Sequence, residues 1–201
     1  LVSWARRCVS ETASATNLYM PSIMRDFPEF HYDEMKSRAE NVLTSYLQSI
    51  TKQNPALLSE GTRELKEQLR LRLEMLQNQS QKESFENIHI HRTEIHQYRK
   101  QRGRQSIVLQ TAVEYFHALK ENGKVIRGSE EHKEQAKYNV ELVYIQDQDM
   151  IENQEDAGLG LNCPNCGAPL PGLGAKKCIY CDTPIVEYNL RVWNFSRVEE
   201  V

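Results

Sequence analysis

The spacing of apolar residues predicts two amphipathic helices in the first half of the chain. From residue 31 to residue 52, apolar side chains recur every three or four positions, which places them on one face of a helix. A second stripe of the same period runs through residues 56–78, so a second helix is expected there. The apolar positions are Met35, Ala39, Val42, Leu43, Tyr46, Leu47 and Ile50 in the first helix and Leu58, Leu65, Leu69, Leu73 and Leu76 in the second.

Residues 1–25 show no such period, and we expect them to form a lead-in segment. Pro21 and Pro28 are expected to break any long helix, so at most a short helix is predicted near the start. A partly ordered lead-in is favoured over a helix that lies in a membrane interface.

After residue 84 the apolar period changes to two, which indicates β-strands. Strands are predicted over residues 88–98, 107–119, 135–145 and 186–198. Turn-forming residues separate the first three strands, as in hairpins. In the last strand the apolar face switches at Val192–Trp193, so a β-bulge is expected there.

Two CxxC pairs stand between the third and fourth predicted strands: Cys163 with Cys166, and Cys178 with Cys181. Two such pairs supply four thiolates at the corners of a tetrahedron, which is the usual ligand set of a structural Zn²⁺ ion. Four thiolates leave no open coordination position for a substrate. Residues 159–186 are therefore predicted to form a zinc ribbon with a structural metal.

The residues around the cysteines support this interpretation and leave two alternatives. Gly167 and Asp182 each follow the second cysteine of a pair, where a positive φ turns backbone amides toward the sulfurs. The alternatives are disulfide pairing in a secreted protein and thiol redox chemistry. A redox CxxC usually occurs singly, and a disulfide set would leave Cys8 over. Cysteine usage thus favours a reducing compartment.

The predicted order of elements is two helices, three strands, a zinc ribbon and a last strand. Helices followed by an antiparallel sheet are typical of the α+β class. Residues 26–158 and 187–201 are expected to form one α+β domain, with residues 159–186 as an insertion before its last strand.

Charge and length exclude some functions. The 201 residues carry a net charge of −3, so a general nucleic-acid-binding surface is not indicated. No run of 18 apolar residues occurs, so no membrane span is predicted. Because the chain begins with Leu1, we expect that a preceding N-terminal segment could tether it to a membrane on the reducing, cytoplasmic side.

Three motifs resemble one known family. They are Asp-Phe-Pro-Glu-Phe at 26–30, Glu-Leu-Lys-Glu-Gln-Leu at 64–69 and Val-Trp-Asn-Phe-Ser-Arg at 192–197. In this order they resemble the C-terminal domain of the mitochondrial inner-membrane translocase subunit 44 family, over roughly residues 26–150 and 186–198. The zinc module departs from the mitochondrial members and resembles inserts in bacterial proteins that carry this domain.

The resemblance implies a cystatin-like cone, in which helices pack in the concavity of a curved antiparallel sheet, as in nuclear transport factor two and ketosteroid isomerase. It also implies association with a membrane surface and a pocket for an acyl chain or an apolar peptide. The tethering of an import motor is not implied, because that role depends on a separate N-terminal region.

Basic residues around the first predicted hairpin are candidates for contact with anionic lipid headgroups. They are Arg92, Arg99, Lys100, Arg102 and Arg104, with His89, His91 and His96 nearby. The alternative is a solvated turn whose charges keep a sheet edge soluble. The spacing of His89 and His91 suits a metal, but a polar outer sheet face is favoured.

Four aromatic residues on predicted strands are candidates for a ligand pocket between helices and sheet: Tyr115, Tyr138, Trp193 and Phe195. The alternative for them is core packing. No catalytic residue is assigned, because fold analogy alone does not support an enzyme.

The sequence thus favours a non-enzymatic binding or scaffold module with structural Zn²⁺, whose partner is a membrane surface or another protein. One alternative is a small-molecule-binding or catalytic cone with an apolar ligand or an isomerase-like pocket. The other is a zinc ribbon that contacts nucleic acid.

Overall fold

The computed structural model describes residues 3–101, 104–145, 166–168, 178–182 and 193–201. The helices are α1 (Ser3–Asp26), α2 (Tyr32–Lys52) and α3 (Arg63–Asn78), with a short 3₁₀ helix, η1 (Pro55–Leu57), between the last two. The strands are β1 (Gln81–Gln101), β2 (Arg104–Glu121), β3 (Lys124–Ile145) and β4 (Trp193–Glu200).

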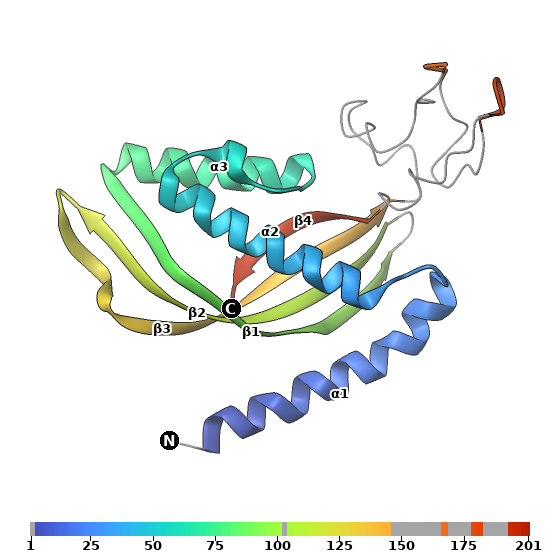
Figure 1. The fold of residues 1–201 in the computed structure, drawn as a ribbon, viewed down its shortest axis with the longest axis horizontal. Helices are drawn as coiled ribbons and strands as arrows, with labels where there is room; N and C mark the ends of the chain where they lie inside the picture. Colours follow the sequence, from blue (N-terminus) through green and yellow to red (C-terminus); the bar gives the residue numbers. More distant parts are fainter. Residues whose placement is uncertain (1–2, 102–103, 146–165, 169–177, 183–192) are drawn as a thin grey trace.

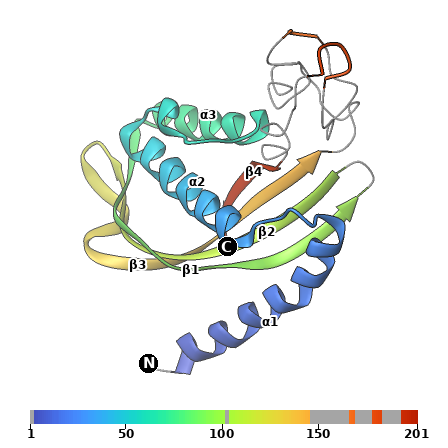
Figure 2. The same cartoon turned by 45° about the vertical axis from the view of Figure 1, so that its right-hand side comes forward.

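The four strands form one antiparallel sheet in the order β1-β2-β3-β4. The sheet is strongly curved, and α2 and α3 lie on its concave side (Figure 1). The first helix, α1, lies on the other side of β1 from α2 and α3, as Figures 1 and 2 both show. The α+β class predicted from the sequence is confirmed, with three helices packed on an open antiparallel sheet.

The core fills the space between the sheet and α2 and α3. The apolar stripes predicted for α2 and α3 are buried almost completely, with Leu43, Leu47, Leu65 and Leu69 fully or nearly fully inaccessible. Thr62 caps α3 by accepting a hydrogen bond from the backbone N–H of Leu65. Acidic residues in the first turn of α2 complement the helix dipole there.

Two expectations about the N-terminal segment are wrong. Residues 3–26 form a single helix, and Pro21 lies inside it. A proline removes one helix hydrogen bond, but tertiary contacts hold the helix on both sides of it. Ile23 is fully buried in the core, and Thr16 bonds to β1. The part of this segment from Thr16 to Ile23 therefore packs against the rest of the structure.

Two strands begin earlier than predicted, β1 at Gln81 and β3 at Lys124. In β1 the inward positions at the start are Glu83 and Phe85, and the buried glutamate hides the apolar alternation. The first part of β3 is largely exposed and polar, so no buried face marks it in the sequence. These stretches are strands because they pair with β2 over its whole length.

The last strand contains a bulge in a different place from the one expected. Leu142 on β3 pairs with Phe195, whereas the preceding residue, Glu141, pairs with Arg197. Ser196 is therefore the extra residue on β4. The bulge brings Val198 to the same face as Phe195, and both are buried. The expected bulge site includes residue 192, which lies outside the described residues, as does the predicted start of this strand.

The outer edge of β1 is closed by side-chain hydroxyl groups. Thr16 of α1 accepts the backbone N–H of Ile95 at 3.0 Å. Tyr32 of α2 donates to the carbonyl oxygen of Thr93 at 3.2 Å, and Thr51 at the other end of α2 accepts the N–H of Phe85 at 2.9 Å. Because an exposed strand edge invites pairing with other chains, these bonds both satisfy and protect the edge.

Replacing Thr51 with valine tests this edge closure. Thr51→Val keeps the side-chain shape but leaves the N–H of Phe85 without its acceptor. We expect the free energy of unfolding in urea to fall by about 1–3 kcal/mol. Thr44→Val is the matched control, because Thr44 is half-buried on the same helix and has no side-chain hydrogen bond among the described residues. Equal losses in the two variants would contradict the role of the hydroxyl.

Candidate functional site

Three of the four predicted metal ligands lie together. The Sγ atoms of Cys166, Cys178 and Cys181 are all within 4.8 Å of one another. The Sγ atoms of Cys166 and Cys178 are 3.7 Å apart, and no disulfide joins the three residues. The fourth predicted ligand, Cys163, lies outside the described residues, as does most of the range 159–186.

The backbone around these cysteines has the geometry that was expected from the sequence. Gly167 has φ of 70° and Asp182 has φ of 54°, so both are in the left-handed region. The N–H of Asp182 bonds to the carbonyl oxygen of Cys178 at 2.9 Å, which closes a tight turn. Within this turn the N–H of Tyr180 points at the Sγ of Cys178 at 3.4 Å. Amide donors of this kind stabilise thiolates and orient them toward a metal.

One of the sulfur–sulfur distances matches the edge of a tetrahedral thiolate site, and all three are within 4.8 Å. With metal–sulfur bonds of about 2.3 Å, neighbouring sulfurs of a ZnS₄ tetrahedron lie about 3.8 Å apart. The separation of 3.7 Å between Cys166 and Cys178 matches that edge and is far longer than a disulfide bond. Cys178 is fully buried, so solvent does not compete for its sulfur. These three residues are therefore compatible with a metal site.

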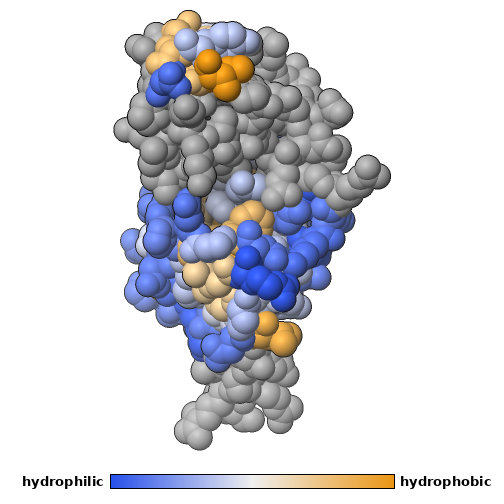
Figure 3. All heavy atoms as spheres, turned by 90° about the vertical axis from the view of Figure 1, so that its right-hand side faces the viewer, coloured by the Kyte–Doolittle hydropathy of each residue, from blue (hydrophilic) through white to orange (hydrophobic). Residues whose placement is uncertain are grey.

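A pocket of ≈ 290 Å³ lies where the connector between α1 and α2 meets the ends of β3 and β4. Its lining residues are Asp26, Phe27, Pro28, Glu29, Phe30, His31, Glu34, Met35, Tyr144 and Trp193. Figure 3 looks onto this end of the molecule, where apolar atoms form a strip between hydrophilic atoms on both sides. Of the four aromatic residues predicted for a pocket, Trp193 lines this one.

The other three predicted pocket residues lie in the core. Phe195 is fully buried beneath α2, and the guanidinium of Arg38 lies 5.5 Å from its ring centroid. Tyr115 and Tyr138 share a hydrogen bond of 2.9 Å between their hydroxyl groups. Burial raises the pKa of Tyr115 to about 12 and raises the pKa of Tyr138 further. Both tyrosines therefore stay protonated and act as packed, hydrogen-bonded core residues.

Four aromatic rings make up the apolar part of the pocket wall. The ring of Phe27 lies 4.6 Å from that of Tyr144 and 4.8 Å from that of Trp193, measured between centroids. The ring of Phe30 lies 5.5 Å from Trp193. Neighbouring rings meet at angles of 54° to 70°, so they form walls in different directions instead of one flat stack.

Three carboxylates surround these rings. Asp26 is occupied, since it pairs with Lys100 and accepts a hydrogen bond from Tyr98, and these contacts lower its pKa to about 2. Glu29 and Glu34 are exposed and have no ion-pair partner among the described residues. Burial, with a smaller effect from the nearby Glu29 carboxylate, raises the pKa of Tyr144. The pocket thus combines aromatic walls with unneutralised negative charge.

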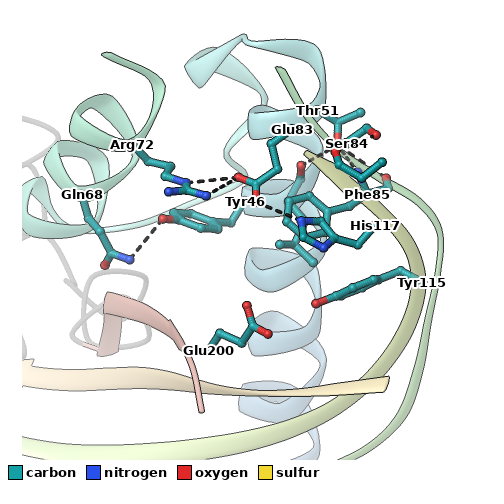
Figure 4. A network of polar contacts seen from close by, with 12 residues as sticks. Tyr46, Thr51, Gln68, Arg72, Glu83, Ser84, Phe85, Tyr115, His117 and Glu200 are labelled. Atoms are coloured by element: carbon teal, nitrogen blue, oxygen red, sulfur yellow. Dashed lines mark hydrogen bonds and ion pairs between the residues drawn. The ribbon is translucent and has the colours of Figure 1, made fainter. Parts of the chain in front are cut away.

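A second group of polar residues lies inside the concave face, between α3 and the first two strands (Figure 4). Oε2 of Glu83 accepts a hydrogen bond from Nη2 of Arg72 at 2.6 Å. Oε1 of Glu83 lies 3.0 Å from Nε2 of His117. The other imidazole nitrogen of His117 lies 3.3 Å from a carboxylate oxygen of Glu134. The ring of Phe85 stacks on the imidazole at 4.8 Å.

This buried group is held by its own contacts and does not resemble a free acid or base. Burial alone would raise the pKa of Glu83, but His117 and Arg72 outweigh it, so the pKa is lowered. The hydrogen bond to Glu83 raises the pKa of His117 despite burial. Both imidazole nitrogens of His117 face carboxylate oxygens, and Glu83 is bound by two side chains. The arrangement therefore stabilises the fold.

Sequence reasoning missed this group and most of the aromatic pocket. His117 occupies an inward position in a predicted strand, whereas Glu83 lies before the predicted start of its strand at residue 88. Alternation with Phe85 and Tyr115 was the available signal. The pocket joins the connector at 27–31 to two strand ends that are distant in the sequence, so no local pattern marks it.

The structure describes four of the five basic residues that were predicted to contact lipid. Three of them are in ion pairs: Arg92 with Glu94, Lys100 with Asp26 and Arg104 with Glu64. Arg99 is exposed, and Arg102 lies outside the described residues. Contact with anionic lipid therefore stays a prediction, and carboxylates already pair with three of the basic side chains that it would use. None of the helices that the structure describes has both the length and the apolarity to span a membrane.

The histidines of β1 do not assemble a metal site in the described part of the chain. The rings of His89 and His91 pack edge to face with centroids 4.8 Å apart. The Nε2 of His91 lies 3.9 Å from an oxygen of Glu114, and no third ligand joins them there. His96 is exposed. The polar outer face favoured by the sequence is the simpler account of these residues.

Comparison with protein-family models and with curated proteins gives no match for this chain.

The buried His117–Glu83 pair predicts a specific dependence of stability on pH. The raised pKa of His117 adds stability below its ordinary value of 6.5, and this stability is lost as the pH rises through the folded-state pKa. The lowered pKa of Glu83 adds stability above 4.5, which is lost as the pH falls. The pair therefore stabilises the fold most between these two values.

His117→Gln is expected to remove the decline in unfolding free energy above pH 6.5. The measurement is urea unfolding, followed by circular dichroism, at a series of pH values. His96→Gln is the control, since it removes an exposed imidazole from the neighbouring strand. A wild-type decline that persists in the His117 variant would show that another group causes it.

Proposed function

We propose that this chain is a non-enzymatic binding module with a structural Zn²⁺ ion bound by Cys163, Cys166, Cys178 and Cys181. The observation that carries the metal proposal is the cluster of three cysteine sulfurs within 4.8 Å of one another. The spacing of the CxxC pairs supplies Cys163 as the fourth ligand, three residues before Cys166 in the sequence.

Zinc is the metal that the donor set favours. Soft thiolate ligands select zinc or iron–sulfur chemistry over the hard cations Mg²⁺ and Ca²⁺. Positive φ at Gly167 and Asp182 and the amide of Tyr180 facing sulfur support a metal knuckle. When bound, zinc supplies a cross-link between the two halves of the insert. Thiolate ligation also supports a reducing compartment.

The binding proposal is supported by the pocket and by the absence of a usable catalytic group in the buried polar cluster. Glu83 and His117 are each bound on both sides by other side chains. The pocket beside Trp193, by contrast, is open to a ligand. An isomerase-like cone would need a buried ionisable group aimed into a cavity, whereas the unpaired carboxylates that line this pocket, Glu29 and Glu34, are exposed.

For the fold, we propose a cystatin-like cone related to the translocase subunit 44 family. The support is the curved sheet with two helices in its concavity (Figure 1), together with the order of the three sequence motifs. The motif residues serve structural roles here: Phe30 and Trp193 pack on each other, and Gln68 bonds to Tyr46. A partner protein or ligand is favoured over a membrane surface, because local carboxylates neutralise most of the basic hairpin residues.

The zinc proposal is tested by metal content. We expect about one zinc per chain in the purified protein, released by a thiol-modifying reagent. Cys178→Ser is expected to lower the zinc content at least tenfold, since a ligand is lost from a closed site. Circular dichroism is expected to show unchanged helix content, because the helices have their own core.

Cys8→Ser is the matched control, because it removes the remaining cysteine, which lies in α1. It is expected to retain full zinc content. A protein without zinc under metal-replete, reducing conditions would contradict the metal site. Unfolding of the whole chain by Cys178→Ser would contradict a separable insert.

A further inference from the structure

We propose that the aromatic pocket binds an organic cation, specifically a methylated ammonium group such as a quaternary ammonium. This inference builds on the proposed function in taking the chain as a binding module, and it names the ligand chemistry. It depends on the pocket residues alone, so it stands or falls separately from the zinc site.

The size of the pocket selects a small group. Pockets for drug-sized ligands usually measure about 300–1,000 Å³. The volume of ≈ 290 Å³ is at the lower end of that range, enough for a compact headgroup or the end of one side chain. It is small for the acyl chain that the family resemblance implies.

The chemistry of the walls selects a cation. Phe27, Phe30, Tyr144 and Trp193 contribute ring surface whose π-electrons attract positive charge, and tryptophan is the strongest of the aromatic residues in this respect. The rings of Phe27, Tyr144 and Trp193 pack on one another, so together they form one aromatic wall that a ligand contacts from the pocket side. The thioether of Met35, also in the lining, adds a polarizable contact.

The charged residues around the pocket also favour a cationic ligand. Glu29 and Glu34 have no ion-pair partner among the described residues. The nearby cations are already used: Lys100 pairs with Asp26, while Arg38 binds Glu60 and the carbonyl oxygen of Trp193. Among the lining residues only His31 can carry a positive charge, and a bound anion would face the two free carboxylates.

Methylation of the ammonium group is favoured because the walls are aromatic. A primary ammonium loses its hydration in such a place and needs hydrogen-bond acceptors in return. A quaternary ammonium has no N–H to satisfy and spreads its charge over methyl groups that pack on rings, as in methyl-lysine and choline sites. The group could belong to a free small molecule or to a methylated side chain of a partner, and the chemistry recognised is the same.

Choline and its neutral isostere, 3,3-dimethylbutan-1-ol, separate charge recognition from apolar contact. The chain has two tryptophans, so Trp4→Phe leaves Trp193 as the only one and makes its fluorescence a reporter of the pocket. We expect choline to change this fluorescence saturably and the neutral isostere to bind at least about tenfold more weakly. Equal responses to choline and its neutral isostere would overturn the proposal.

Two variants test the walls and the charge separately. Phe27→Leu retains apolar bulk but removes a ring, and it is expected to weaken choline binding about 3-fold to 30-fold, measured by calorimetry. The double variant Glu29→Gln/Glu34→Gln is expected to weaken it about 3-fold to 10-fold, with a smaller effect at high salt. Glu86→Gln is the matched control, because Glu86 is exposed on β1 and does not line the pocket. A loss of binding in Glu86→Gln equal to that in the double variant would overturn the charge argument.

Two further arms identify the source of the cation and separate this inference from the zinc site. A short peptide with one trimethyllysine, compared with its unmethylated form, tests a partner side chain against free choline, and preferential binding of either methylated probe supports the proposal. Zinc content is measured on the same sample. Protein that holds zinc but ignores both methylated probes overturns the cation site alone, whereas protein that binds choline without zinc overturns the metal site alone.

Discussion

The backbone groups along the open edge of β1 need hydrogen-bond partners, and side chains of α1 and α2 supply three of them. These bonds help to fix both helices against the sheet. Hydroxyl groups of Thr16, Tyr32 and Thr51 reach this edge from α1 and from both ends of α2. Two helices on opposite sides of one strand are thereby fixed relative to the sheet (Figure 2). The connector that joins them lies beside the end of β3 and the start of β4. The aromatic pocket is at this place.

Curvature of the sheet adds a second constraint, because a concave face must be filled by the two helices above it. Register shifts interrupt the pairing of β1 with β2 at three places, and such irregularities bend and twist strands. Near α3 the filling includes charged groups, with Arg72, Glu83 and His117 in contact. Since each charge is paired, the cost of burying them is offset, and removing one partner would leave the others uncompensated.

The sequence predicted those features that repeat over short distances. Leucine spacing located α2 and α3, and two CxxC pairs predicted a cysteine cluster of which three members lie together. Features produced by tertiary context were missed. Pro21 stays inside α1 because Ile23 and Thr16 are held by the core and by β1. The start of β1 was hidden because Glu83 occupies an inward position that only a partner such as His117 makes acceptable.

The two CxxC pairs lie in the sequence between Tyr144 and Trp193, two residues of the pocket wall. The contacts of the pocket nevertheless do not depend on the cysteine cluster. Tyr144, near the end of β3, pairs directly with Trp193, the first residue of β4, so the strands on both sides of the insert are joined by the sheet itself. The two rings are 5.2 Å apart, and Phe27 packs on both. These contacts involve neither cysteine pair. A metal in the insert therefore need not hold the pocket together, and the insert can present its own surface while the pocket binds a ligand.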